Sequence, residues 1–246
     1  MSMEPQAQEL AQFLIKRLQS TPSSSRLVIG LCGIPASGKS TLAVSIVNWT
    51  NKLLHTAQNV DSGADRIVDE DAAILVGLDG WHLTRAQLDA LPEPQLAHDR
   101  RGAHWTFDGP AYVDFLRSLR APLTTRTPPI VAPSFDHAVK DPTPASVSIL
   151  PHHRIIVIEG LYTFLNIEPW ADGAALLDER WYLSVDPVVA QERLVKRHVQ
   201  SGVARDMAEA VWRATENDMP NGKFITENML QPTRIIESIT DLAISS

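Results

Sequence analysis

Short apolar runs recur along the chain, and longer stretches with a helical spacing of apolar residues separate them. The runs are apolar at successive positions, and they cover residues 26–32, 72–80, 154–160 and 180–186. Strands that are apolar on both faces are typical of a parallel sheet covered by helices on both sides. The pattern therefore predicts an α/β fold, with one doubly wound parallel sheet in a single domain.

Helix signals surround these runs. A helix is predicted from about residue 39 to residue 55, and a polar, acidic segment at 58–71 is expected to form a surface loop. An amphipathic helix is predicted near the N-terminus, and its apolar face is formed by Leu10, Phe13, Leu14 and Leu18.

Two more helices are predicted towards the end of the chain. Asp186 has the character of an N-cap, Pro187 suits the first helical position, and Gly202 is a stop signal. The segment 206–218 predicts a second helix, which should end before Pro220 because proline disrupts a helix interior.

About seventy residues lie between the second and third apolar runs, which is longer than a simple crossover connection. The stretch interleaves Trp, His and Arg, contains a helical pattern after Asp108, and then becomes rich in proline. Asp108 is predicted to be the N-cap of that helix. Residues 80–150 are therefore expected to be an insertion that covers a substrate.

The composition is that of an ordinary globular protein of 246 residues, with 44% hydrophobic and 21% charged residues. A net charge of -7 argues against a nucleic-acid or membrane-surface partner, so an anionic ligand would need local positive groups. The one cysteine, Cys32, lies in an apolar run and is expected to pack in the core. With no signal peptide or membrane span predicted, a cytoplasmic location is expected.

The stretch "GIPASGKS" fits the Walker A pattern between a predicted strand and a predicted helix. Its glycines allow the backbone amides to converge on an anion, and the helix N-terminus adds its dipole. Lys39 would contact the outer phosphates, and Ser40 would be a magnesium ligand. The residues expected to bind ATP are Gly33, Ile34, Pro35, Ala36, Ser37, Gly38, Lys39, Ser40 and Thr41.

Two carboxylates stand at the ends of apolar runs. Asp79 ends the second run and Glu159 ends the third, so both belong at the carboxyl edge of the sheet, beside the phosphate loop. Phosphoryl transfer requires a metal near the phosphates and a group that acts on the attacking hydroxyl. We expect Asp79 to receive the acceptor's proton and Glu159 to position Mg²⁺, directly or through water. Two alternatives stay open: the roles are exchanged, or Asp79 only caps the turn at Gly80.

The succession of "DGWHL", "RRGAHWTFD", "SFDHAVKDP", "VIEGLY" and "VDPVVAQERLVKRH" resembles the uridine kinase, phosphoribulokinase and bacterial pantothenate kinase family of P-loop kinases. The likeness covers residues 26–245 and is greatest to the sugar-kinase-like branch, which has Phe where this chain has Trp81. The resemblance implies an ATP-dependent kinase with Mg²⁺, in which Asp79 acts on the acceptor hydroxyl and Glu159 is the strand-ending glutamate. It also implies a possible homo-oligomer.

Several side chains are candidates to hold the acceptor. His82 and Arg85 follow Asp79 closely, although an ordinary surface turn is the alternative. Of the adjacent Arg100 and Arg101, at most one should face the ligand, and Arg101 is preferred. Asp136 and His137 are further candidates from the proline-rich segment. Trp105 and Phe107 could stack on a ring or pack in the core.

The helix after residue 187 presents basic side chains. Arg193 and Arg197 are four residues apart and share one helix face. The resemblance implies that residues 187–220 form a lid and the helices that follow it, with Arg193 and Arg197 over the phosphates and Arg205 as a weaker third. The alternative is a solvated face beside Glu192 and Lys196.

The expected function is ATP-dependent transfer of the γ-phosphoryl group to a hydroxyl of a sugar, nucleoside or similar metabolite. A nucleotide-binding regulatory NTPase without this activity is the alternative. A GTPase switch would need Asn-Lys-x-Asp, and "NKLL" at residue 51 lacks the Asp.

Overall fold

The computed structural model describes residues 3–61, 70–136 and 139–239. Its main sheet is parallel throughout and has the strand order β2-β5-β1-β6-β7. The strands are β1 (Leu27–Gly33), β2 (Ala73–Gly77), β5 (Ile155–Glu159), β6 (Glu179–Ser184) and β7 (Arg234–Glu237). The predicted doubly wound α/β fold is confirmed, and β7 is a strand that the apolar pattern did not reveal.

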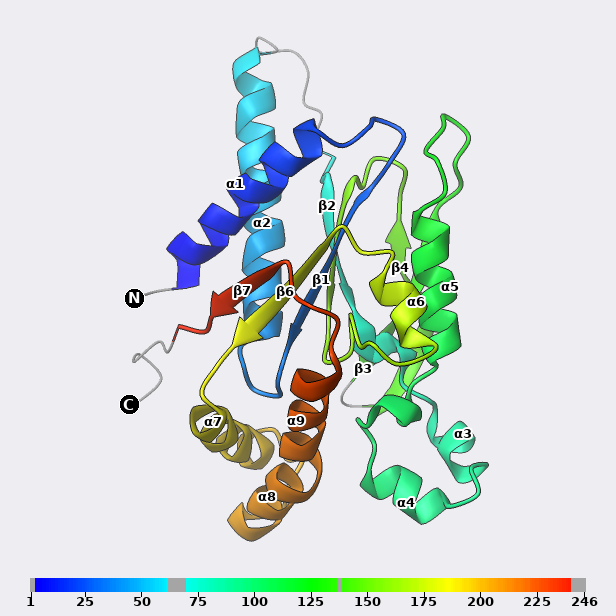
Figure 1. Ribbon diagram of the computed structural model, residues 1–246, viewed down its shortest axis with the longest axis vertical. Helices are drawn as coiled ribbons and strands as arrows, with labels where there is room; N and C mark the ends of the chain where they lie inside the picture. The colour runs from blue at the N-terminus through cyan, green and yellow to red at the C-terminus, as the bar shows by residue number, and fades with distance from the viewer. Residues whose placement is uncertain (1–2, 62–69, 137–138, 240–246) are drawn as a thin grey trace.

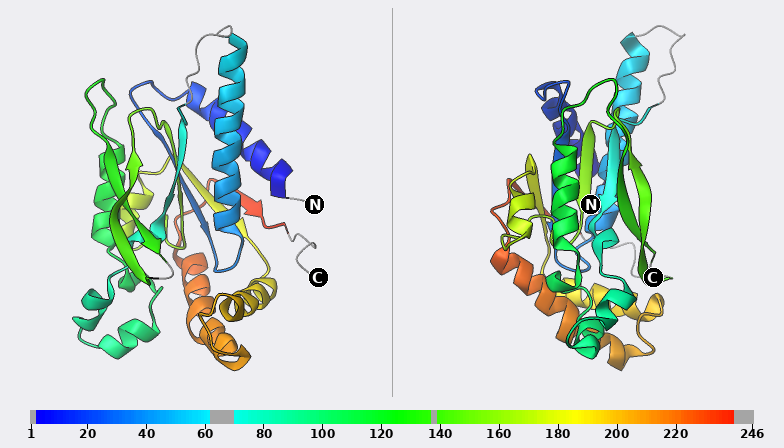
Figure 2. Two further views of the ribbon diagram at one scale, coloured as in Figure 1. Left: turned by 180° about the vertical axis from the view of Figure 1, so that it is seen from behind. Right: turned by 90° about the vertical axis from the view of Figure 1, so that its right-hand side faces the viewer.

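Helices cover both faces of the sheet (Figures 1 and 2). On one face lie α1 (Met3–Gln19) and α2 (Lys39–Asp61), and on the other lie α5 (Gly109–Leu119) and α6 (Trp170–Ala174). A hydrophobic core lies on each face of the sheet, and alternate side chains of β1 pack in one or the other. Ile29 packs on the α1 and α2 side, and Val28 packs on the α5 side. This explains why the strand is apolar at every position.

The helix predicted after the phosphate loop is longer than expected, and most of the predicted acidic loop lies outside the described residues. The helix after the phosphate loop extends to Asp61, beyond the expected end at residue 55. The rest of the predicted acidic loop up to residue 69 lies outside the described residues.

The apolar face of α1 is confirmed, because Leu10 and Leu14 are buried and Phe13 and Leu18 pack against the same core.

The insertion after β2 is built from short elements. A 3-10 turn, η2 (Leu78–Trp81), leads into α3 (Arg85–Asp89), α4 (Pro94–Asp99) and the 3-10 turn η3 (His104–Thr106). After α5, β3 (Ile130–Asp136) and β4 (Asp141–Ile149) form a separate antiparallel hairpin. Asp108 caps α5 as predicted, since its carboxylate accepts a hydrogen bond from the Ala111 amide.

The chain after β6 forms α7 (Pro187–Gln200), α8 (Met207–Arg213), a π-helical turn (Ala214–Asp218) and α9 (Met219–Asn228). Asp186 caps α7 and Pro187 occupies its first turn, as predicted. Together with α3 and α4, these helices lie at the carboxyl end of the sheet, in the lower part of Figure 1. None of the helices within the described ranges has the length and apolar character needed to cross a bilayer.

The prediction that the helix from residue 206 ends before Pro220 is wrong. The π-helical turn carries the chain into α9 and places Pro220 in its first turn. Pro220 has no N–H to donate within a helix, and the π-helical turn before it pairs residues five apart, as in the bond from the Met219 amide to the Ala214 carbonyl. The Glu216 carbonyl of this turn also accepts a hydrogen bond from the Arg100 guanidinium of the insertion.

Candidate active site

The loop between β1 and α2 has the backbone that a phosphate cradle requires. Ala36 (φ 60°) and Gly38 (φ 94°) adopt left-handed conformations, so the loop curls back on itself. At Gly33 a β-carbon would lie 2.6 Å from Ser37 Oγ and 2.9 Å from the Leu183 carbonyl oxygen. The small residues are therefore needed for the loop to close, and the loop leads directly into the N-terminus of α2.

Elements from both ends of the chain brace this loop. The Ser37 carbonyl accepts a hydrogen bond of 2.7 Å from Ser238, directly after β7. Ser238 Oγ in turn accepts one of 3.3 Å from Arg193 of α7. At Gly38, a β-carbon would lie 3.7 Å from the end of the Met3 side chain of α1. Arg193 is thus connected to the phosphate loop through Ser238.

Ser40 and Glu159 form the polar centre of the site. The Ser40 hydroxyl donates a 3.0 Å hydrogen bond to Glu159 Oε1, while Oε2 is buried without a partner among the described residues. Burial raises the pKa of Glu159, and the Asp79 charge adds to this, against the opposing effects of Lys39, Ser40 and Arg197. The electrostatic partners of Glu159 are therefore the residues predicted to carry the chemistry.

These oxygens fit a Mg²⁺ ion. A buried carboxylate oxygen without a partner is costly, and a hydroxyl lies next to it. Mg²⁺ is commonly held by one or two carboxylates together with substrate phosphates and waters. The described residues contain no group of three His, Cys, Asp or Glu arranged for a metal. The site therefore suits a metal ion whose remaining ligands are phosphate oxygens of the nucleotide and waters.

Asp79 lies just beyond β2, in η2. The strand register pairs Gly77 with Glu159, so the ends of β2 and β5 are adjacent. The side chain of Asp79 is 47% exposed, which leaves its carboxylate accessible to a ligand. Its backbone carbonyl accepts hydrogen bonds from the His82 amide and from His82 Nδ1, the latter at 2.9 Å. Because a carbonyl only accepts, Nδ1 carries the proton.

His82 is held by aromatic rings and is not in an ordinary surface turn. Its side chain is 11% exposed, and its ring lies 3.9 Å from that of Phe107 and 4.9 Å from that of Phe135. Phe107 is buried, and it packs in the core, whereas Trp105 is 41% exposed. The core alternative is therefore correct for Phe107.

Arg85 and Arg101 both bind Asp141, at the start of β4. Arg85 donates its amide at 2.8 Å and its Nε at 3.2 Å, and Arg101 donates Nη2 at 3.3 Å. Burial alone would raise the pKa of Asp141, but these hydrogen bonds outweigh it and lower the pKa. Arg101 also donates to the carbonyls of Leu83 and Lys140. In this arrangement the two arginines fasten the hairpin to the segment after Asp79.

The remaining predicted residues are spread over the insertion and the lid. Asp136 is exposed at the end of β3, and His137 lies outside the described residues. Arg197 acts on the pKa of Glu159, whereas Arg205 is hydrogen-bonded to Glu209 at 2.9 Å and its side chain is 86% exposed. The structure therefore links Arg193 to the phosphate loop and Arg197 to Glu159, whereas Arg205 is bonded within its own segment to Glu209.

Comparison with known proteins gives the family. No family model matches the chain. It is 36% identical over 214 residues to a candidate uridine kinase of Schizosaccharomyces pombe, and the aligned region covers 87% of this chain and 84% of that protein. The chain belongs to the uridine kinase-like P-loop kinases. It is also 50% identical over 153 residues, covering 62% of this chain and 89% of the relative, to the ATP-dependent kinase-like protein notR' of Aspergillus versicolor.

The fold of this P-loop kinase is also found in solved structures. A candidate fructose transport system kinase from Silicibacter sp. TM1040 superimposes with a TM-score of 0.75 and 27% identity, covering 96% of this chain and 98% of the other. All three names describe kinases or kinase-like proteins, and the two names that mention a substrate mention different ones. The acceptor is thus a separate question from the fold.

Two residues of the site region were missed by sequence reasoning. Asp141 was not singled out, and the sequence gives no local signal for it, because Arg85 and Arg101 lie 56 and 40 residues before it. Ser238 carries no motif, and its bond to the Ser37 carbonyl depends on the pairing of β7 with β6.

Proposed function

We propose that this kinase transfers the γ-phosphoryl group of ATP to a hydroxyl of a small metabolite, such as a sugar or a nucleoside. The observation that carries the proposal is the half-buried Glu159, whose Oε2 is buried without a partner among the described residues, whose Oε1 is bonded to Ser40 of the phosphate loop, and whose pKa is raised in part by Asp79. A cation site and an accessible carboxylate at the end of a phosphate cradle are the parts that phosphoryl transfer needs.

In this mechanism the loop from Gly33 to Thr41 and the Lys39 ammonium hold the phosphates. Ser40 and Glu159 would hold Mg²⁺, which neutralises developing charge on the phosphate oxygens. Asp79 takes the proton from the acceptor hydroxyl. The acceptor oxygen forms its bond to the γ-phosphorus as the bond from that phosphorus to the β–γ bridging oxygen breaks, and ADP leaves.

The arginines of α7 have a separate role in the proposal. Arg193 and Arg197 would close on the phosphates, since one is linked to the loop through Ser238 and the other acts on Glu159. Closure would exclude water, which otherwise competes with the acceptor for the phosphoryl group.

The acceptor would lie beside the exposed carboxylate of Asp79, with His82, Arg85, Arg101, Asp136 and His137 as its predicted contacts. Because Arg85 and Arg101 already bind Asp141, we expect them to act on the acceptor mainly by fixing the walls of its site.

The proposal is tested by ADP release from purified protein with ATP and Mg²⁺, with and without pools of sugars, nucleosides and vitamins. Acceptor-dependent release is expected, and Lys39→Ala should abolish it. If every pool gives the same slow release as buffer, the protein is an NTPase without a small-molecule acceptor, and the proposal fails.

A further inference from the structure

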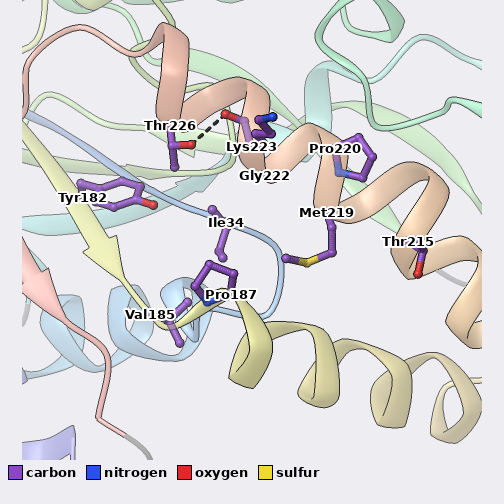
Figure 3. A pocket seen from close by; sticks show the side chains of 10 residues that line it. All are labelled: Ile34, Tyr182, Val185, Pro187, Thr215, Met219, Pro220, Gly222, Lys223 and Thr226. Atoms are coloured by element: carbon purple, nitrogen blue, oxygen red, sulfur yellow. Dashed lines mark hydrogen bonds between the residues drawn. The ribbon is translucent and has the colours of Figure 1, made fainter.

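An apolar cavity lies against the phosphate loop, which contributes Ile34 to its lining. Its volume is about 510 Å³, and it is bounded by the end of β6, the first residue of α7 and the beginning of α9. Figure 3 shows the side chains of Ile34, Val185, Pro187 and Met219 around a common space. Protein interiors contain few voids larger than a water molecule, whereas ligand pockets occupy about 300–1,000 Å³. The size is therefore that of a ligand site.

The cavity is separate from the phosphate cradle. Ile34 belongs to the loop, but the described residues that line the cavity include none of Lys39, Ser40 or Thr41. Gly222 of α9 packs directly on the back of the loop, since a β-carbon there would lie 3.1 Å from Ile34 Cβ. The close contact fixes α9 against the loop, so this wall of the cavity is set by backbone.

The polar groups of the cavity indicate what kind of molecule it would take. Lys223 lines it, and the described lining residues contain no carboxylate. The ammonium of Lys223 lies 3.7 Å from Glu227, but both side chains are largely exposed, so this pair is weak. Burial raises the pKa of Tyr182 to about 12, so its hydroxyl is neutral and can donate. Because its side chain is 76% exposed, the Lys223 ammonium lies at the rim of the cavity, and apolar walls with one cation at the rim complement a molecule with one negative charge.

We propose that this cavity binds a small molecule with an aromatic or branched apolar body and a single anionic group, at a site distinct from that of ATP. The body would pack among Ile34, Pro187 and Met219, and the anionic group would face Lys223. The hydroxyl of Tyr182 would supply a neutral donor.

The test uses two fluorescent probes on the purified full chain: anilinonaphthalene sulfonate, which carries one negative charge, and phenylnaphthylamine, its uncharged analogue. Both should bind the wild type. Lys223→Met should weaken the sulfonate about threefold and leave the neutral probe unchanged. Met219→Trp and Thr226→Trp fill the cavity from different positions on α9, and each should weaken both probes by about tenfold or more. Thermal unfolding identifies any variant that does not fold.

Trp212→Ala is the matched control, because this side chain is 53% exposed on α8 and does not line the cavity. It should leave both probes unaffected. Loss of probe fluorescence in this control would place the probes on the outer face of α8 and overturn the proposal. Unchanged binding to the folded cavity-filling variants would also overturn it, as would competitive displacement of the probes by ATP.

Discussion

The Ser40 hydroxyl donates a hydrogen bond to Glu159 Oε1 across 3.0 Å, joining the first turn of α2 to the last residue of β5. The second oxygen of the carboxylate is buried without a partner among the described residues, and burial raises the pKa of Glu159. The folded protein therefore holds a negative charge that lowers its stability, at a place where a bound cation would neutralise that charge. An unfavourable charge of this kind is expected at a functional site, where activity is gained at a cost in stability.

Replacing Glu159 tests this trade-off. Glu159→Gln should lower turnover by about 100-fold or more, because the charge that holds the metal is lost. In the absence of nucleotide it should raise the free energy of unfolding by about 1 kcal/mol at neutral pH. Thermal unfolding of the two proteins checks the second effect. Glu192→Gln removes a carboxylate from the exposed face of α7 and should change neither quantity.

The sign of the pH dependence follows from the raised pKa of Glu159. The folded state binds this proton more tightly than the unfolded state does. Its contribution to stability is therefore full below the unfolded pKa and is lost as pH rises through the higher folded pKa. The gain from Glu159→Gln should be present at neutral pH and disappear in acid. A gain that is equal at all pH values would contradict this origin.

Asp141 should behave in the opposite way. Its hydrogen bonds to Arg85 and Arg101 lower its pKa, so its contribution is present above the unfolded pKa and is lost as pH falls through the folded one. Asp141→Asn should cost about 1 kcal/mol at neutral pH and less in acid, measured by urea unfolding. Arg101→Ala should cost more than Arg85→Ala, because their side chains are 17% and 56% exposed. Equal losses would show that burial does not set the strength of these contacts.

The bond from Arg100 to the Glu216 carbonyl ties the π-helical turn to the insertion. Arg100→Ala should cost about 1 kcal/mol of stability in urea unfolding, since the carbonyl loses this donor. Glu216→Ala is the control and should cost less, because the bond uses the backbone and not the side chain. A loss from Glu216→Ala as large as that from Arg100→Ala would contradict this origin.

The sequence alone predicts the features that depend on residues close together in the chain. The phosphate loop, the caps Asp108 and Asp186, and the burial of Cys32 were predicted because each follows from local spacing. Glu159 was placed correctly because it ends an apolar strand.

Features that depend on distant contacts were not predictable in the same way. The strand β7 has four residues, and only its pairing with β6 identifies it. The π-helical turn keeps the helix running past Pro220, and its Glu216 carbonyl binds a guanidinium from more than a hundred residues earlier in the chain. The bonds of Arg85 and Arg101 to Asp141 could not be predicted for the same reason, since Asp141 lies 56 and 40 residues after them.

The central claim is that the phosphoryl group goes from ATP to an acceptor hydroxyl prepared by Asp79. The most direct measurement follows the label of γ-phosphate-labelled ATP into a metabolite pool, with wild type and with Asp79→Asn. The account predicts a labelled metabolite with the wild type. With Asp79→Asn the transfer rate should fall by about 100-fold or more, while the affinity for ATP stays unchanged. Label found only as inorganic phosphate, or transferred equally well by Asp79→Asn, would contradict it.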